Sequence, residues 1–219
     1  MPKKISLFYI IPVVLSAVLF VSGCKTQTAS STTTPAAAQT APAATQTATQ
    51  STVPAQPQTP QPPALVLNGG AYRVKAGRDS AFTDSQGRVW QADQGFSGGD
   101  VIERDADTKI TGTKDPNMFM TEHYSMDSFA CRIPNGNYTA NLYFAETYDG
   151  ISGPGDRVFS FNVQGHEFKD FDVWAKAGGN YRPYVETVPV TVTNGVFRID
   201  FTSQVENPEI NAIELIPAS

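Results

Sequence analysis

A two-residue alternation of apolar and polar side chains runs through most of the C-terminal half of this sequence. In residues 138–144 the apolar side chains at even positions fall on one face, and Thr139, Asn141 and Tyr143 fall on the other. The same alternation recurs in residues 159–163, 188–192 and 197–201. Successive side chains of a β-strand point to opposite faces, so the pattern predicts strands with one buried face. From residue 72 onward no segment has a convincing helical period.

Turn-forming residues separate these runs at short intervals. Clusters of Gly, Pro and Asn lie at residues 134–137, 153–156, 164–165 and 194–195. Asn194-Gly195 stands between two clean alternating runs, and this dipeptide favours a two-residue hairpin turn. We therefore expect residues 188–192 and 197–201 to form a hairpin. Many short strands joined by such turns predict an all-β sandwich or barrel, and the lack of helical crossovers argues against an α/β enzyme.

All the acidic residues and most of the aromatic residues lie in residues 65–219, which we expect to be the folded domain. Residues 1–64 hold three lysines and no acid, whereas residues 65–219 carry 13 basic and 21 acidic groups. A net charge of -5 has the wrong sign for a protein that neutralises nucleic-acid phosphates, so we expect no nucleic-acid partner. Two cysteines and two histidines are too few for a disulfide scaffold or a cysteine- or histidine-rich metal centre.

The N-terminal 23 residues have the composition of a secretory signal. Two lysines precede an apolar stretch at residues 5–21, which ends in Val21-Ser22-Gly23-Cys24. An uncleaved transmembrane helix is the alternative, since the stretch is just long enough to span a bilayer. The ending resembles the lipobox of bacterial lipoproteins, which implies cleavage before Cys24 and acylation of its thiol. Such lipidation would anchor the chain to a membrane of the cell envelope, and Lys25 favours the outer membrane if the host is Gram-negative.

Residues 24–64 are predicted to be the lipidated cysteine and a disordered linker. Of the 40 residues after Cys24, 38 are Thr, Ala, Gln, Pro or Ser, and Lys25 carries their only charge. A segment of this composition buries too little apolar surface to offset the entropy of ordering.

Several motifs in residues 68–217 resemble malectin-type domains, which are carbohydrate-binding jelly rolls of an endoplasmic-reticulum lectin and many bacterial surface proteins. They include Thr-Glu-His-Tyr at residues 121–124, Phe-Ala-Glu-Thr-Tyr at 144–148 and Asn-Pro-Glu-Ile-Asn-Ala at 207–212. Further matching stretches lie at residues 73–77, 83–93, 133–139, 157–159 and 175–179. The resemblance implies a jelly-roll-like antiparallel β-sandwich that binds an oligosaccharide or polysaccharide, such as a glucan or a cell-surface glycan.

The resemblance also implies where a sugar would bind. Sugar recognition needs aromatic rings against the C–H patch of a pyranose and planar polar groups for its hydroxyls. The family's pocket residues correspond here to Tyr124, Tyr148 and the acid Glu206, and more loosely to Phe96. Asp149 stands where the lectin has another aromatic residue, so the lectin's disaccharide specificity does not carry over.

Each of these residues also has a purely structural interpretation. Tyr124 would close a strand end over the core, and Glu206 would be a solvated turn acid beside Asn207. Tyr148 lies in a loop with little core to pack on, which favours the binding interpretation. We expect Trp90 and Trp174 to be core residues, Cys131 to be a small buried hydrophobe, and His123 to have no catalytic role.

Two other function classes stay open. A cell-surface adhesion or protein-interaction module would show an exposed apolar patch on a sheet face. A glycoside hydrolase needs two carboxylates across a deep cleft, which a domain of this size rarely provides, so we expect no enzyme activity and no catalytic residue. We expect no cofactor, although residues 98–107 have oxygens suited to a structural calcium ion. The chain is expected to be monomeric.

Overall fold

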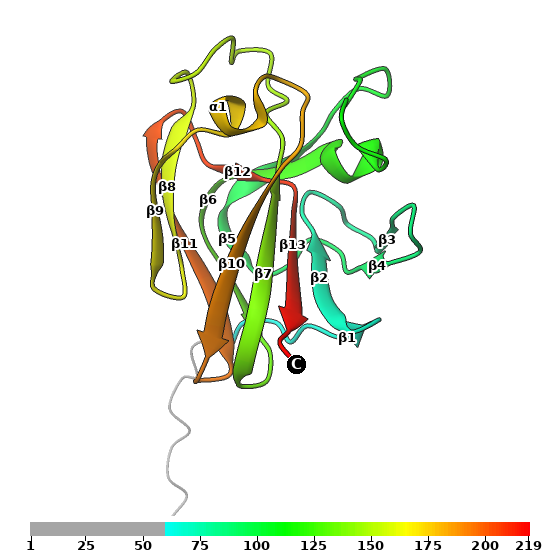
Figure 1. Ribbon diagram of the computed structural model, residues 1–219, viewed down its shortest axis with the longest axis vertical. Coiled ribbons are helices and arrows are strands. Elements are labelled where there is room, and N and C mark those ends of the chain that lie inside the picture. The colour runs from blue at the N-terminus through cyan, green and yellow to red at the C-terminus, as the bar shows by residue number, and fades with distance from the viewer. Residues whose placement is uncertain (1–59) are drawn as a thin grey trace, which may run out of the picture. The chain divides into compact units, whose positions relative to one another are not determined.

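The computed structural model describes residues 60–219, which form two antiparallel sheets packed face to face (Figure 1). The signal segment, Cys24 and the linker up to residue 59 lie outside the described residues. The all-β sandwich predicted from the sequence is confirmed. Within residues 60–219 neither helix has the length and apolar character needed to span a bilayer.

One sheet has five strands in the order β1–β2–β13–β7–β10. Their bounds are β1 Leu67–Asn68, β2 Ala71–Lys75, β13 Ala212–Pro217, β7 Gly136–Phe144 and β10 Tyr184–Val192. The other sheet has the order β12–β6–β11–β8–β9, and β5 pairs with β6. Its strands are β12 Glu209–Ile210, β6 Thr121–Arg132, β11 Val196–Val205, β8 Val158–Val163, β9 His166–Phe171 and β5 Phe96–Glu103. A small hairpin pairs β3 (Phe82–Thr83) with β4 (Val89–Trp90).

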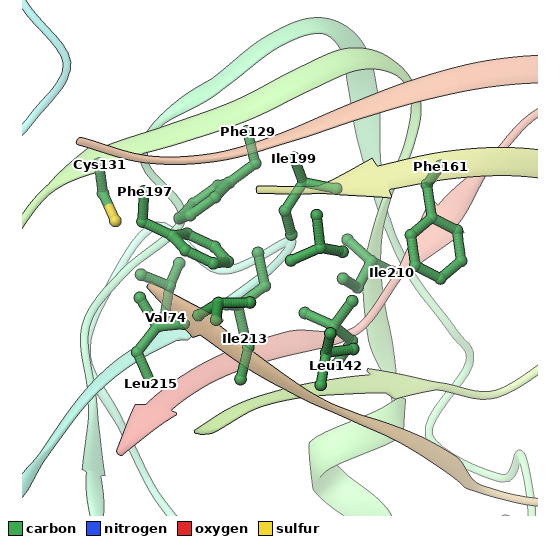
Figure 2. Close-up of a cluster of buried hydrophobic side chains, with 14 of the residues drawn as sticks. Val74, Phe129, Cys131, Leu142, Phe161, Phe197, Ile199, Ile210, Ile213 and Leu215 are labelled. Atoms are coloured by element: carbon green, nitrogen blue, oxygen red, sulfur yellow. The ribbon is translucent and has the colours of Figure 1, made fainter. Parts of the chain in front are cut away.

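The core lies between the two sheets and consists of the alternating apolar side chains. Figure 2 shows Val74, Leu142 and Ile213 from the five-stranded sheet facing Phe129 and Ile199 from the other. Burying a side chain of this size contributes about 1.5–3 kcal/mol to the free energy of unfolding. Cys131 is buried in the same cluster, as predicted, and burial raises the pKa of its thiol to about 12.

The predicted Asn194-Gly195 hairpin is wrong. Residues 194–195 do make a turn, but it joins β10 in one sheet to β11 in the other. β10 pairs instead with β7 over nine residues, and β11 pairs with β6 and β8. Both runs bury their apolar faces in the core between the sheets, and each run approaches that core from its own sheet. Two strands paired with each other would instead lie in the same sheet. The two-residue hairpin occurs between β8 and β9, where Gln164 and Gly165 both have positive φ.

A second hydrophobic cluster lies apart from the main core and is formed largely by residues 82–120. Trp90, Met118 and Phe119 are its large buried side chains, and Tyr143 and Tyr181 pack against it. Trp90 is fully buried, so the prediction that it is a core residue is confirmed. Its indole Nε1 donates a 3.0 Å hydrogen bond to Asp84. Trp174 belongs to neither cluster and is only partly buried. It lies on the short helix α1 (Val173–Ala177), which Asp172 caps through Ala175 N–H at 2.8 Å.

A buried lysine ties together the strands that lead to one end of the sandwich. The Nζ atom of Lys75 donates to the carbonyls of Ala76, Thr121 and Asn211 and to the Thr121 hydroxyl, at 2.6–2.9 Å. Burial lowers the pKa of Lys75 to about 7. These contacts fix the start of β6, which follows the 3-10 helix η1 (Pro116–Phe119). The loops β7–β8 and β9–β10 gather at the end of the sandwich opposite the C-terminus (Figure 1).

Candidate functional site

Four segments far apart in the sequence line one cavity of about 280 Å³. The lining residues are Ile102 and Arg104 from β5 and its end, Glu122 and Tyr124 from β6, Tyr148 and Arg157 from the β7–β8 loop, and Glu206 and Asn207 before β12. Strand pairing sets this arrangement, because Ile102 lies opposite Glu122 and Glu209 lies opposite Tyr124. The volume is near the lower end of the range for small-molecule pockets. The structure thus brings together three of the predicted residues: Tyr124, Tyr148 and Glu206.

One part of the cavity lining is a hydrogen-bonded group centred on Glu122. Arg104 Nη2 donates to Glu122 Oε1 at 2.7 Å, and the Thr147 hydroxyl donates to Oε2 at 2.9 Å. Arg104 Nε also donates to the Thr147 hydroxyl oxygen at 2.8 Å. Burial raises the pKa of Glu122, although the Arg104 guanidinium and the Thr147 hydroxyl oppose that shift. Both oxygens of Glu122 are therefore already engaged inside the protein.

A second ion pair supports the loop that carries Tyr148. Arg157 Nε donates to Glu146 Oε2 at 2.7 Å, and Glu146 Oε1 accepts from the Tyr148 backbone N–H at 2.9 Å. Arg157 Nη1 donates to the carbonyl of Asn207, which joins this loop to the segment before β12. Buried pairs of this kind are costly to break, because removing one partner leaves a charge without compensation. Glu146 and Arg157 thus hold both walls of the cavity.

A fully buried acid lies close to these two pairs. Glu209 has no exposed surface, and neither of its carboxyl oxygens has a hydrogen-bond partner within residues 60–219. Burial raises the pKa of Glu209 well above its usual value, and the Glu122 and Glu146 carboxylates raise it further. The Arg157 and Arg104 guanidinium groups oppose this rise in the pKa of Glu209, but burial, which disfavours the charged form, is its largest cause.

The two tyrosines at the cavity differ in exposure. The Tyr148 side chain is 46% exposed, and Tyr124 is partly buried. A Cβ atom added to Gly150 would lie 2.6 Å from Cζ of Tyr148, so the absence of a side chain at 150 makes room for the ring. Glu206 is exposed and has a φ of 57°, a backbone conformation that a non-glycine residue rarely adopts. Glu206 thus lies at a bend between β11 and β12 and lines the cavity.

Asp149 and Phe96, two of the predicted site residues, do not line the cavity. The Asp149 carboxylate accepts a hydrogen bond from the Tyr181 hydroxyl, and Asp149 is not among the lining residues. The structure also places Phe96 away from the cavity. Its ring stacks on His123, with centroids 4.2 Å apart, and packs on Phe129. His123 in turn contacts Asp93 at 2.9 Å and the Gly98 carbonyl at 3.0 Å, which is a structural role.

The segment considered for calcium is mostly a strand. Residues 98–103 belong to β5 and pair with β6, so their backbone oxygens do not encircle a common point. In the described part of the chain no three His, Cys, Asp or Glu side chains are grouped so that they could hold a metal ion. A larger cavity of about 450 Å³ adjoins at Ile102 and is lined by Gly77, Arg78, Asp79, Asp93, Val101 and Glu103. It offers no aromatic ring, so the smaller cavity is the better candidate for a sugar.

Sequence reasoning did not find Arg104, Arg157 or Glu122 as parts of the site. Arginine and glutamate are common surface residues, and their partners here lie 11 to 43 residues away. One signal was available for Glu122, which occurs two residues before Tyr124 and therefore shares its strand face.

Comparison with known proteins identifies the family. Residues 71–213 match the malectin domain. The chain belongs to the malectin domain family.

Relatives of this malectin domain are parts of much larger proteins. It is 33% identical over 139 residues to a probable leucine-rich repeat receptor-like serine/threonine-protein kinase of Arabidopsis thaliana, which covers 59% of this chain and 13% of the kinase. It is 34% identical over 84 residues to receptor-like protein 4 of the same plant, covering 37% of this chain and 13% of that protein. The chain therefore spans about an eighth of the length of these relatives.

Solved structures share the fold at low sequence identity. A β-glucuronidase of Bacteroides uniformis superimposes with a TM-score of 0.61 at 21% identity, over 68% of this chain and 18% of the enzyme. The ANXUR2 extracellular domain of Arabidopsis thaliana superimposes with a TM-score of 0.57 at 16% identity, over 65% of this chain and 47% of that domain. At such identities the likeness concerns the fold alone.

Proposed function

We propose that this malectin domain binds carbohydrate in the cavity between Tyr124 and Tyr148. The observation that carries the proposal is one cavity that combines two tyrosine side chains with arginine donors and carboxylate and amide groups. Aromatic rings cover the apolar face of a pyranose, while donors and acceptors at the cavity edge bind its hydroxyl groups. Malectin-family membership supports the same conclusion, because the family resemblance of Tyr124, Tyr148 and Glu206 implies a sugar site.

The two arginines keep donors available for a ligand. Arg104 uses Nε and Nη2 inside the protein, and Arg157 uses Nε and Nη1. The remaining terminal nitrogen of each, Nη1 of Arg104 and Nη2 of Arg157, has no hydrogen bond to any residue from 60 to 219. A guanidinium presents its N–H groups in a fixed plane, which suits pairs of sugar hydroxyls.

The charge balance favours a neutral sugar. Each arginine is paired with a glutamate, so neither offers an uncompensated positive charge to an acidic sugar. Glu206 adds an exposed carboxylate at the cavity mouth, which would repel a uronic acid or a sulfated sugar. The ligand class that fits is a neutral oligosaccharide or polysaccharide, such as a glucan.

We propose binding without hydrolysis. A glycosidase needs one carboxyl group to donate a proton to the leaving oxygen and another to act as nucleophile or base. Of the two carboxylates that line the cavity, Glu122 already accepts from Arg104 and Thr147 on both oxygens.

Protein interaction is the second candidate, since the solved structures that share this fold include FER in complex with the plant peptide RALF23 and LLG2. Its expected signature is a broad apolar patch, and the described residues contribute seven exposed large apolar side chains, which come from separate segments of the chain apart from the pair Val66 and Leu67.

We further propose that a lipid on Cys24 anchors the malectin domain to the cell envelope, in the outer membrane if the host is Gram-negative. The support is the apolar stretch that ends in Val-Ser-Gly-Cys, followed by Lys25. Mass spectrometry of the chain produced in a bacterium should find an acylated N-terminal Cys24, and Cys24→Ser should block both cleavage and acylation. A mature N-terminus at any other residue would contradict the anchor.

A glycan array tests the binding proposal. The chain without its signal segment and Cys24, residues 25–219, should bind neutral glycans, and Tyr148→Ala should lose that binding. Equal binding of neutral glycans by Tyr148→Ala and the parent would place the site elsewhere, and binding of no glycan would refute the proposed function.

A further inference from the structure

Two loop segments at the cavity are joined by three hydrogen bonds. The backbone N–H of Tyr181 donates to the Glu146 carbonyl at 2.8 Å, and the Tyr181 hydroxyl donates to the Asp149 carboxylate. The Asn180 side chain donates to the Ile151 carbonyl at 2.8 Å. These bonds lie on both sides of Tyr148, the most exposed ring at the cavity. The β9–β10 loop therefore supports the β7–β8 loop directly before and after that ring.

Tyr181 is itself held firmly. Its backbone has a φ of 56°, which is costly for a tyrosine and persists only where surrounding contacts enforce it. Its carbonyl accepts from the Thr111 backbone N–H at 2.8 Å, and its ring packs against the second hydrophobic cluster around Trp90. Because Tyr181 is anchored to the domain in this way, its hydrogen bonds can restrict the motion of the β7–β8 loop.

We propose that Tyr181 is a positioning residue that holds the Tyr148 ring in its binding orientation through Asp149. This inference rests on the proposed sugar site, and it gives Asp149 a role outside the cavity. Where the lectin of this family has a second aromatic residue, this chain has a carboxylate that fastens the loop to Tyr181. A ring ordered before the ligand arrives loses less conformational freedom on binding, so the affinity depends on a hydrogen bond that does not touch the sugar.

The test is Tyr181→Phe, which removes only the hydroxyl and keeps the ring in the hydrophobic cluster. We expect the affinity for the best glycan to fall roughly three- to tenfold, which corresponds to the net contribution of one hydrogen bond. The thermal midpoint should stay close to that of the parent. The matched control is Tyr184→Phe, because the Tyr184 hydroxyl also donates to a carboxylate, Glu186 at 2.9 Å, and Tyr184 does not line the cavity.

Fluorine NMR of the chain labelled with fluorotyrosine reports on the ring without any ligand. The resonance that disappears in Tyr148→Phe belongs to Tyr148, and it should shift or broaden in Tyr181→Phe and not in Tyr184→Phe. A Tyr148 resonance unchanged in Tyr181→Phe overturns the proposal, as does an unchanged affinity. If the parent binds no glycan, the proposed function fails, and the resonance alone decides whether Tyr181 holds Tyr148.

Discussion

Glu209 and Tyr124 are direct cross-strand partners, so a fully buried carboxyl group lies next to a ring that lines the cavity. Side chains paired in this way project to the same side of a sheet. The acid has no hydrogen-bond partner among residues 60–219, and the charged groups that shift its pKa are Glu122, Glu146, Arg157 and Arg104. The site therefore adjoins a buried acid whose charged form is disfavoured by burial.

This arrangement predicts a pH-dependent stability. The pKa of Glu209 is raised in the folded state by burial and then by Glu122 and Glu146. Such a carboxyl group stabilises the fold fully below its unfolded pKa, and the stabilisation is lost as the pH rises toward the folded pKa. Unfolding by urea from pH 5 to 9 should show Glu209→Gln becoming more stable relative to the parent as the pH rises. The exposed Glu206→Gln should follow the parent, and parallel curves for all three would contradict this account.

A small change in the loop should weaken sugar binding without affecting the fold. In Gly150→Ala the new methyl group would collide with the Tyr148 ring and displace it. We expect roughly tenfold weaker glycan binding by calorimetry, since a stacked ring contributes about 0.5–1.5 kcal/mol beyond its buried area. Gly153→Ala in the same loop is the control, because a Cβ atom there meets nothing within 4 Å. Similar losses in both variants would mean that general loop stiffness, rather than the ring position, determines binding.

The two tryptophans should differ sharply in their effect on stability. Trp90→Ala opens a void in the second hydrophobic cluster and leaves Asp84 without its indole donor, so it should cost about 3–5 kcal/mol. Trp174→Ala should cost about 1 kcal/mol or less, because the side chain is only partly buried on a five-residue helix. Denaturant melts of both variants provide the comparison, and equal losses would place Trp174 in a core that the structure does not show.

Contacts to the domain begin before residue 65, where the folded domain was predicted to start. The backbone N–H of Arg132 donates to the Pro63 carbonyl at 2.7 Å, and its guanidinium donates to Gln61 at 2.9 Å. Relative to a chain that starts at residue 60, one that starts at residue 65 should lose about 1–2 kcal/mol of stability. Scanning calorimetry should detect this as a midpoint lower by about 2–8 °C. Identical midpoints would show that residues 60–64 add nothing.

The strands could be predicted from sequence more securely than their partners. Alternation marks which residues face the core, and the runs at 138–144 and 197–201 are strands β7 and β11. It does not say which strand lies alongside, because an apolar face can be buried from either sheet of a sandwich. The Asn194-Gly195 dipeptide favours a hairpin turn locally, but in this fold it connects β10 in one sheet to β11 in the other.

The candidate site could be predicted in part. Tyr124, Tyr148 and Glu206 follow from the family motifs, and the structure places all three at one cavity. Arg104 and Arg157 could not be found, because their roles depend on ion pairs between distant segments. The contact of Asp149 could not be predicted either, because its partner Tyr181 lies 32 residues further along and is brought near only by the fold.

Isothermal titration of residues 25–219 with the best neutral glycan is the most direct test of the central claim. The account predicts a dissociation constant of roughly 10 μM to 1 mM for the parent, as expected for a small open cavity. Tyr148→Ala should bind at least tenfold more weakly with an unchanged thermal midpoint, while Tyr184→Phe should bind like the parent. A Tyr148→Ala chain that binds the glycan as tightly as the parent would contradict the assignment of this cavity as the carbohydrate site.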